Sequence, residues 1–142
     1  MPITSEMALT ALNLGLQKAN DLKEPSTLAI VDAGGNLLAY IRQPEAGLAT
    51  VAIAQGKAYT ALALRSPSGD WMEAVQPGGA LYGLNHLGDH RPIVVFGGGL
   101  PVFSDGKLIG AVGVSGGPVP IDVDIAEVMV AALLSAQPKR EL

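Results

Sequence analysis

The chain of 142 residues contains no cysteine, few aromatic residues and little charge. The absence of cysteine excludes disulfides, thiolate nucleophiles and cysteine-ligated zinc. The nine basic residues are scattered, so no positive surface for phosphate contacts is predicted and we expect no nucleic-acid partner. No apolar run reaches the length of about 18 residues that predicts a membrane-spanning helix. The start of the chain, Met1–Glu6, lacks a signal-peptide pattern. We therefore expect a cytoplasmic protein with no membrane partner.

Apolar residues, in contrast, are abundant. They make up 49% of the chain, whereas charged residues make up 15% and the formal net charge is −4 at pH 7. The length favours one domain over residues 1–142, and such a domain can bury a core without a metal or a disulfide. Because charged side chains are too few to cover the surface, some apolar area should stay exposed on a monomer. We therefore expect a homo-oligomer that covers this area.

The spacing of apolar residues and turn signals predicts three helices and five strands. Helices are predicted from Thr4 or Ser5 to about Asp21–Lys23, over Leu48–Leu64 and over Ile121–Ala136. Strands are predicted over Thr27–Val31, Leu37–Arg42, Pro92–Phe96, Leu100–Phe103 and Lys107–Val114. Hairpin connections dominate this order, so the sequence predicts an α+β domain with a five-stranded, mainly antiparallel sheet on which the helices pack.

A glycine-rich run, Phe96–Gly117, is the strongest local pattern. It predicts two strands joined by a turn at Asp105. Glycines on both sides of this hairpin indicate either close packing or a ligand against bare backbone. The candidate ligand-binding residues are Gly97, Gly98, Gly99, Ser115, Gly116 and Gly117. The last three precede a helix, where free N–H groups can bind an anion, or they simply let the strand turn into the helix. The run matches neither a phosphate-binding P-loop nor a Gly-x-Ser-x-Gly nucleophile motif.

Four polar residues near the predicted core are candidates for chemistry. Lys57 lies on the most apolar helix, where it could pair with a carboxylate or act as a base if burial lowers its pKa. The alternative is a lysine at the helix edge with its charge in water. Tyr59 and Thr60 either face a ligand or make local hydrogen bonds. Asp32 is either a turn residue that hydrogen-bonds its own backbone or a catalytic base.

Further candidates lie in the irregular middle of the chain. Gln76 and Tyr82 belong to a loop of the type that lines pockets. His86 and His90 are the two histidines, four residues apart as in a helical metal pair. However, Gly88 lies between them and Pro92 follows, which disfavours a continuous helix. We therefore expect these histidines on the surface and predict no firm metal site.

Four stretches together resemble a known family. They are Ile30–Leu38, Ala54–Ala61, Gln76–Leu84 and the glycine run ending at Gly117. In this order they resemble the family that includes GlcG, HbpS and the C-terminal domain of PduO corrinoid adenosyltransferases, over about residues 6–135. The resemblance implies a profilin-like fold, homo-oligomers and, in some members, binding of haem or a corrinoid. The chain departs from the family at Pro118–Asp124, where many relatives start the helix with more acidic charge.

We interpret the chain as a small-ligand-binding protein. The ligand would lie between the Leu48–Leu64 helix and the glycine hairpin, with Lys57 supplying charge, and the resemblance favours haem or a related tetrapyrrole as the ligand and possible cofactor. One alternative is a cofactor-free lyase or isomerase for a small organic acid, with Lys57 or Asp32 as base and the glycine-loop N–H groups as an oxyanion site. Another is an oligomeric accessory protein without turnover.

Overall fold

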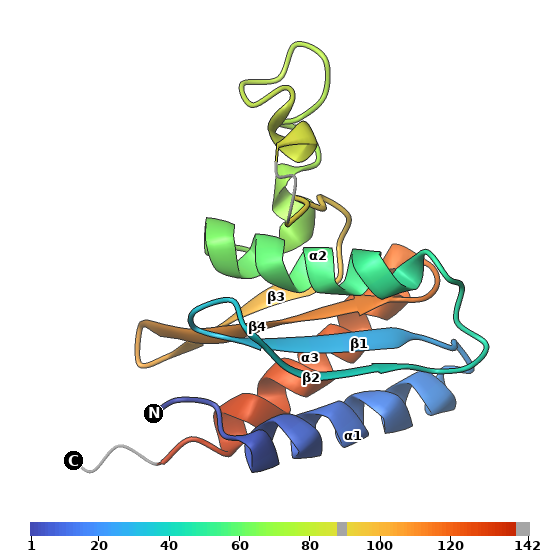
Figure 1. The fold of residues 1–142 in the computed structure, drawn as a ribbon, viewed down its shortest axis with the longest axis vertical. Coiled ribbons are helices and arrows are strands. Elements are labelled where there is room, and N and C mark those ends of the chain that lie inside the picture. Colours follow the sequence, from blue (N-terminus) through green and yellow to red (C-terminus); the bar gives the residue numbers. More distant parts are fainter. Residues whose placement is uncertain (88–90, 139–142) are drawn as a thin grey trace.

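The computed structural model describes residues 1–87 and 91–138, which form three α-helices, two short 3₁₀ helices and four strands (Figure 1). The helices are α1 (Ser5–Asp21), α2 (Thr50–Leu64), α3 (Val119–Ser135), η1 (Ser68–Trp71) and η2 (Leu84–His86). The strands are β1 (Thr27–Asp32), β2 (Leu37–Arg42), β3 (Gly99–Ser104) and β4 (Lys107–Ser115). The predicted α+β class and all three main helices are confirmed.

One antiparallel sheet forms the centre of the molecule. Its strand order is β2-β1-β4-β3, and all neighbouring strands run antiparallel. The β3–β4 hairpin closes through Asp105 and Gly106, which both have positive φ, 51° and 75°. Such a two-residue turn matches the right-handed twist of paired strands. Asp105 is thus the turn residue that the sequence predicts.

The prediction of a fifth strand over 92–96 is wrong for the described residues: the sheet contains four strands. The Ile-Val-Val run there looks like a strand, but Pro92 has no N–H to donate. The N–H of Val94 instead donates to the Thr60 hydroxyl on α2, at 2.8 Å. This segment therefore crosses α2 and does not pair with the sheet.

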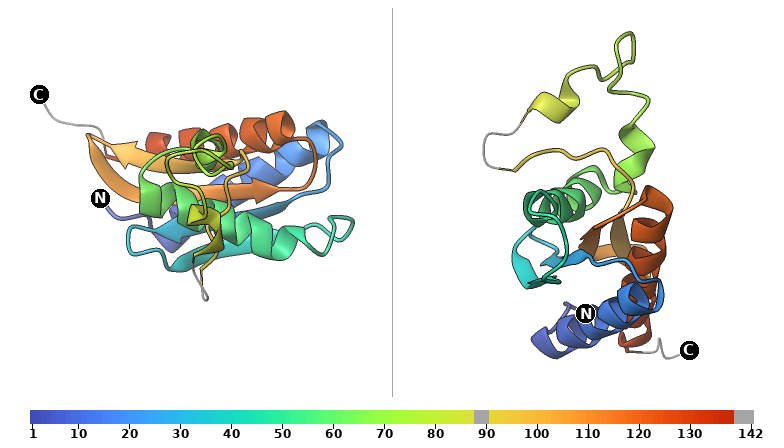
Figure 2. Two further views of the ribbon diagram at one scale, coloured as in Figure 1. Left: turned by 90° about the horizontal axis from the view of Figure 1, so that it is seen from above. Right: turned by 90° about the vertical axis from the view of Figure 1, so that its right-hand side faces the viewer.

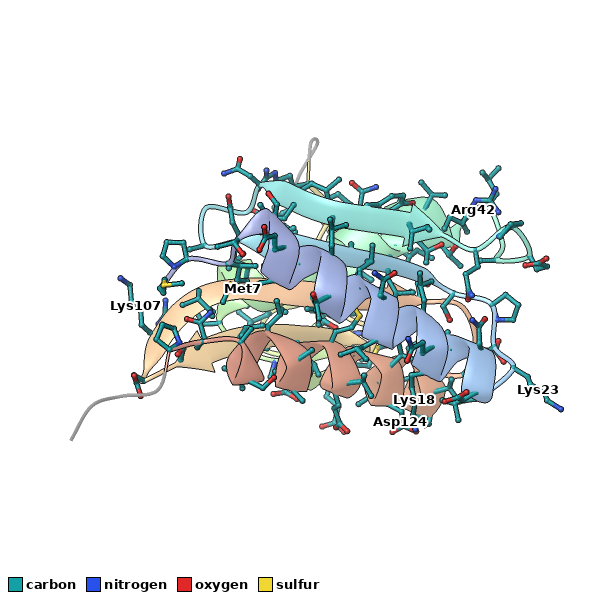
Figure 3. All side chains as sticks on the ribbon, turned by 90° about the horizontal axis from the view of Figure 1, so that it is seen from below. Met7, Lys18, Lys23, Arg42, Lys107 and Asp124 are labelled. Atoms are coloured by element: carbon teal, nitrogen blue, oxygen red, sulfur yellow. The ribbon has the colours of Figure 1, made fainter. Side chains whose placement is uncertain are left out.

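Helices cover both faces of the sheet. α1 and α3 lie side by side on one face, and α2 lies on the other (Figures 1 and 3). The alternation of side chains along β1 explains this layering: Leu28 and Ile30 are buried against α1 and α3, whereas Ala29 and Val31 face α2. α1 starts with Thr4, whose side-chain oxygen accepts a hydrogen bond from Met7 N at 3.1 Å.

The face of the sheet beneath α2 is made of very small residues. Ala29, Gly113 and Gly99 are direct neighbours across β1, β4 and β3. A Cβ at Gly113 would collide with the backbone of α2 at Ala54 and Ala58. The backbone of α2 therefore lies directly on the sheet, and this contact fixes the positions of the side chains that α2 carries.

A long excursion between α2 and β3 projects from the body (Figures 1 and 2). η1 anchors its base through contacts with α2 and β3. We call the part beyond η1, residues 72–87, the arm. Leu81, Tyr82 and Leu87 on the arm are 40%, 64% and 62% exposed. Among the helices of the described residues, none is both long and apolar enough to cross a membrane.

Candidate functional site

A surface cavity of about 280 Å³ lies beside α2. Three parts of the chain form it: the exposed side of α2, the β1–β2 hairpin, and the segment that returns from the arm. Its lining residues are Val31, Gly35, Leu37, Ala52, Gln55, Gly56, Tyr59, Arg91 and Pro92. The cavity therefore depends on the seating of α2 on the sheet and on the path of the returning segment.

The cation of the cavity is Arg91. Its guanidinium carbon lies 5.0 Å from the centre of the Tyr59 ring, within the range of a cation–π contact. The guanidinium also approaches Gly35, where an added Cβ would lie 2.5 Å from Nη1 of Arg91. Gly35 has a positive φ of 82°, which is why the hairpin turn favours glycine there. The turn and the tyrosine together hold Arg91 at the cavity.

The remaining lining combines apolar and polar groups. Val31, Leu37, Ala52 and Pro92 supply apolar surface, and Gln55 and Tyr59 supply polar atoms. A planar cation beside apolar surface suits a flat ligand that carries a carboxylate. Within residues 1–87 and 91–138, no group of three or more His, Cys, Asp or Glu side chains could hold a metal ion.

A buried ion pair lies on another side of α2. Lys57 Nζ is 3.0 Å from Asp122 Oδ2, and both side chains are 2% exposed. Lys57 Nζ also donates to the carbonyl oxygen of Val114 at 2.8 Å. The other oxygen of Asp122 accepts a hydrogen bond from Gly117 N at 3.3 Å. The pair thus links α2, the end of β4 and the start of α3 in one polar cluster.

Burial dominates the protonation of both partners. It lowers the pKa of Lys57 and raises the pKa of Asp122, while the attraction between the two charges opposes both shifts. Lys57 does not line the cavity. Its ammonium group is instead held by an internal carboxylate and a carbonyl oxygen, which explains how a lysine is buried in this helix.

The glycine run packs closely around this ion pair. An added Cβ at Gly98, whose φ is 123°, would lie 3.0 Å from Lys57 Nζ, and one at Gly99 would collide with the carbonyl of Lys57. Gly97 would meet Val119 of α3. The sequence left two alternatives for these glycines, close packing or contact with a ligand. Close packing accounts for the glycine at each of the three positions.

The remaining candidates from the sequence are distributed over several places. Ser115 is the buried last residue of β4, Gly116 packs against Ser26, and Gly117 N faces Asp122. Gln76 and Tyr82 lie on the arm and do not line the cavity. His86 is an exposed residue of η2, and His90 lies outside the described residues. Of the predicted ligand-binding residues, Tyr59 is therefore the one that lines the cavity, whereas Lys57 pairs with Asp122 and the Thr60 hydroxyl accepts a hydrogen bond from Val94 N.

Asp32 organises the turn that supports the cavity wall. Its Oδ1 accepts hydrogen bonds from the N–H groups of Gly34 and Asn36, both at 2.9 Å. The Asn36 backbone N–H is the main reason that the pKa of Asp32 lies below its ordinary value, with Gly34 and the charge of Arg91 contributing. This geometry is that of a turn residue, and it keeps the carboxylate ionised.

We expect Asp32→Ala to lower the melting temperature at pH 7 by about 3 °C, since it removes hydrogen bonds worth about 1 kcal/mol. Because the pKa of Asp32 is lower in the folded state, its stabilisation is complete above the unfolded value and is lost as pH falls through the folded value. The difference between wild type and variant should therefore shrink in melting curves recorded below about pH 4. A difference that grows on acidification would contradict this role.

Sequence reasoning missed Arg91, Gln55 and Asp122. Asp122 lies in the first turn of α3, where the helix dipole alone favours an acid, so its sequence position does not point to a lysine partner. Arg91 carries no signal either, because it lies in an irregular segment and reaches the cavity only through the path of that segment after the arm. Gln55 lies on the same helix, two residues before Lys57, and unlike Lys57 it lines the cavity.

Comparison with known proteins places these observations in a family. The family model described as "Haem degrading protein HbpS-like" matches residues 3–131. The "Uncharacterized 15.0 kDa protein in dhaT-dhaS intergenic region" of Citrobacter freundii is 48% identical over 110 residues, which are 78% of this chain and 77% of that protein. The corrinoid adenosyltransferase PduO of the same organism is 41% identical over 83% of this chain, which spans 35% of the PduO length.

A solved structure agrees with this assignment. The crystal structure of a PduOC:haem complex superposes with a TM-score of 0.87 and 38% sequence identity, covering 93% of this chain and 95% of that one. The resemblance to GlcG, HbpS and PduO is therefore confirmed: the sequence similarity extends over most of the chain, and the fold is shared. The chain belongs to the HbpS-like family.

Proposed function

We propose that this protein binds haem or a related tetrapyrrole at the cavity beside α2. The observation that carries the proposal is the cavity itself, which places Arg91 and Tyr59 next to the apolar side chains of Val31 and Leu37. Tetrapyrroles with free propionates combine a flat apolar ring with acidic groups, and this lining offers a partner for each. The 38% identical relative that was solved as a haem complex supports the same ligand class.

The size and chemistry of the cavity define how such a ligand fits. The volume of about 280 Å³ lies just below the range of about 300–1,000 Å³ for small-molecule pockets. It therefore suits the acidic edge of a tetrapyrrole, and the rest of the ring would need other surface. Among the lining residues, the Tyr59 phenol is a group of a type that binds haem iron in other proteins.

A haemin titration followed at the Soret band tests the proposal. We expect a saturable, stoichiometric shift for the wild type and a loss of about tenfold or more in affinity for Ala52→Phe, whose ring would fill the cavity. Ala131→Phe is the matched control, because Ala131 is an exposed alanine of α3 on the opposite side of the sheet. Equal affinities for the two variants would contradict binding at the cavity. A wild-type spectrum identical to that of free haemin would contradict haem as the ligand.

We also propose that the chain forms homo-oligomers through the arm. The arm projects from the body in Figure 1 and in the right-hand view of Figure 2, and Leu81, Tyr82 and Leu87 expose apolar surface that a second copy would cover. Light scattering of the purified chain tests this: a mass that is a multiple of 14.5 kDa is expected, and a monomer mass would contradict it.

A further inference from the structure

The position of Arg91 constrains the chemistry of the ligand more closely than the cavity volume does. Its guanidinium carbon lies 5.0 Å from the centre of the Tyr59 ring, and its Nη1 lies close to Gly35, where an added Cβ would be 2.5 Å away. These two contacts orient a planar fork of N–H donors at the cavity, and such a fork matches the two oxygens of a carboxylate. Among the described residues no group accepts a hydrogen bond from the guanidinium, so its N–H donors are available to a ligand.

The described residues around Arg91 favour a bound anion, and the positive charge at the cavity comes from Arg91. Within residues 1–87 and 91–138, Arg91 is the one charged residue that lines the cavity. The nearby acid, Asp32, directs its carboxylate at the N–H groups of Gly34 and Asn36. Leu37 and Pro92 supply apolar surface beside the guanidinium, and Arg91 itself is exposed, so a ligand can reach it from solvent.

We infer that Arg91 is the anchor of a carboxylate-binding subsite, and that the ligand presents a free carboxylate attached to a flat unsaturated body. If the ligand is a tetrapyrrole, the carboxylate is one of its propionates, and the inference then rests on the proposed function. The same chemistry is offered by a small free aromatic acid that fits the cavity whole. The acid group, not the metal, then determines which ligands the cavity accepts.

A comparison of haemin with its dimethyl ester isolates the contribution of the carboxylates to binding, because the two molecules differ only in the free propionates. We expect the wild type to bind haemin about tenfold or more tightly than the ester, since a charge-assisted hydrogen bond is lost with the ester. Arg91→Gln should remove this preference. Arg65→Gln is the matched control: its guanidinium also lies over an aromatic ring, 5.5 Å from the centre of Phe103, but it does not line the cavity.

The outcomes distinguish this inference from the proposed function. If the wild type and Arg91→Gln show the same ratio of haemin to ester affinity, the inference is overturned while haem binding stands. If neither porphyrin binds the wild type, the proposed function fails, and the melting temperature with millimolar benzoate decides the inference. An increase in wild type and Arg65→Gln that Arg91→Gln lacks supports a free acid as the ligand. No increase in any of the three proteins overturns the subsite.

Discussion

Replacing Lys57 with methionine is expected to lower the free energy of unfolding by about 3–5 kcal/mol. The substitution leaves Asp122, which is 2% exposed, as a buried carboxylate without its cation. The hydrogen bond from Gly117 N remains, but it cannot replace a full positive charge 3.0 Å away. Replacing Asp122 with leucine should have a loss of similar size, since it leaves the ammonium group of Lys57 unpaired. Urea denaturation of the purified variants measures both losses.

The double variant Lys57→Met/Asp122→Leu gives the sharper result. Burial outweighs the mutual attraction in its effect on both pKa values, which means that removing both charges also removes both desolvation penalties. We therefore expect the double variant to lose about 2 kcal/mol, because the Val114 carbonyl and the Gly117 N–H lose their partners, which is far less than the sum of the single losses. Lys107→Met, at the exposed β3–β4 turn, is the control and should change stability by less than about 0.5 kcal/mol. Additive losses in the double variant would refute a coupled pair.

The pH dependence of Lys57→Met checks the same account. In this variant the pKa of Asp122 should lie above its unfolded value, because burial raises it and no ammonium group opposes the shift. A raised folded-state pKa gives stability that is complete below the unfolded value and is lost as pH rises through the folded value. The variant should therefore regain stability relative to wild type when the pH falls from 7 towards about 4.

The second large effect is expected at Gly113. A valine there would place its Cβ against the backbone of α2 at Ala54 and Ala58, where no side chain can rotate away. α2 must then lift from the sheet, and we expect a loss of about 3 kcal/mol or more in the free energy of unfolding. Because α2 carries Tyr59 and Ala52, the cavity should also be disturbed in any Gly113→Val protein that still folds.

Gly47→Val is the matched control for this substitution. An added Cβ at Gly47 has no atom within 4 Å, and the residue has no positive φ, so a change of less than about 0.5 kcal/mol is expected. Denaturation curves for the two variants, recorded side by side, give the comparison. A Gly113→Val protein as stable as Gly47→Val would show that α2 does not rest directly on β4.

Local patterns in the sequence were sufficient to predict most of the fold. Turn residues and alternation predicted β1, β2, β3 and β4 to within a residue or two, because each strand is bounded by chemistry that it carries itself. The run over 92–96 has the same local composition, yet the Thr60 hydroxyl takes the N–H that a neighbouring strand would need. That competition is tertiary and is not visible in a window of a few residues.

The candidate site was harder to predict for the same reason. Lys57 was recognised as unusual, but its partner Asp122 lies 65 residues away in sequence. Arg91 reaches the cavity because the chain returns across α2 after the arm, and no periodic pattern determines that path. The resemblance to the family supports the ligand class that we propose, whereas the residues that line the cavity are known from the structure.

Hydrogen–deuterium exchange of the full chain, with and without saturating haemin, tests the central claim most directly. Binding at the cavity should slow exchange in peptides covering 33–36 and 91–95, which border it outside regular strands and helices, and leave the α1–α3 face unchanged. Slower exchange in the arm alone, or on the α1–α3 face at full occupancy, would contradict the proposed site.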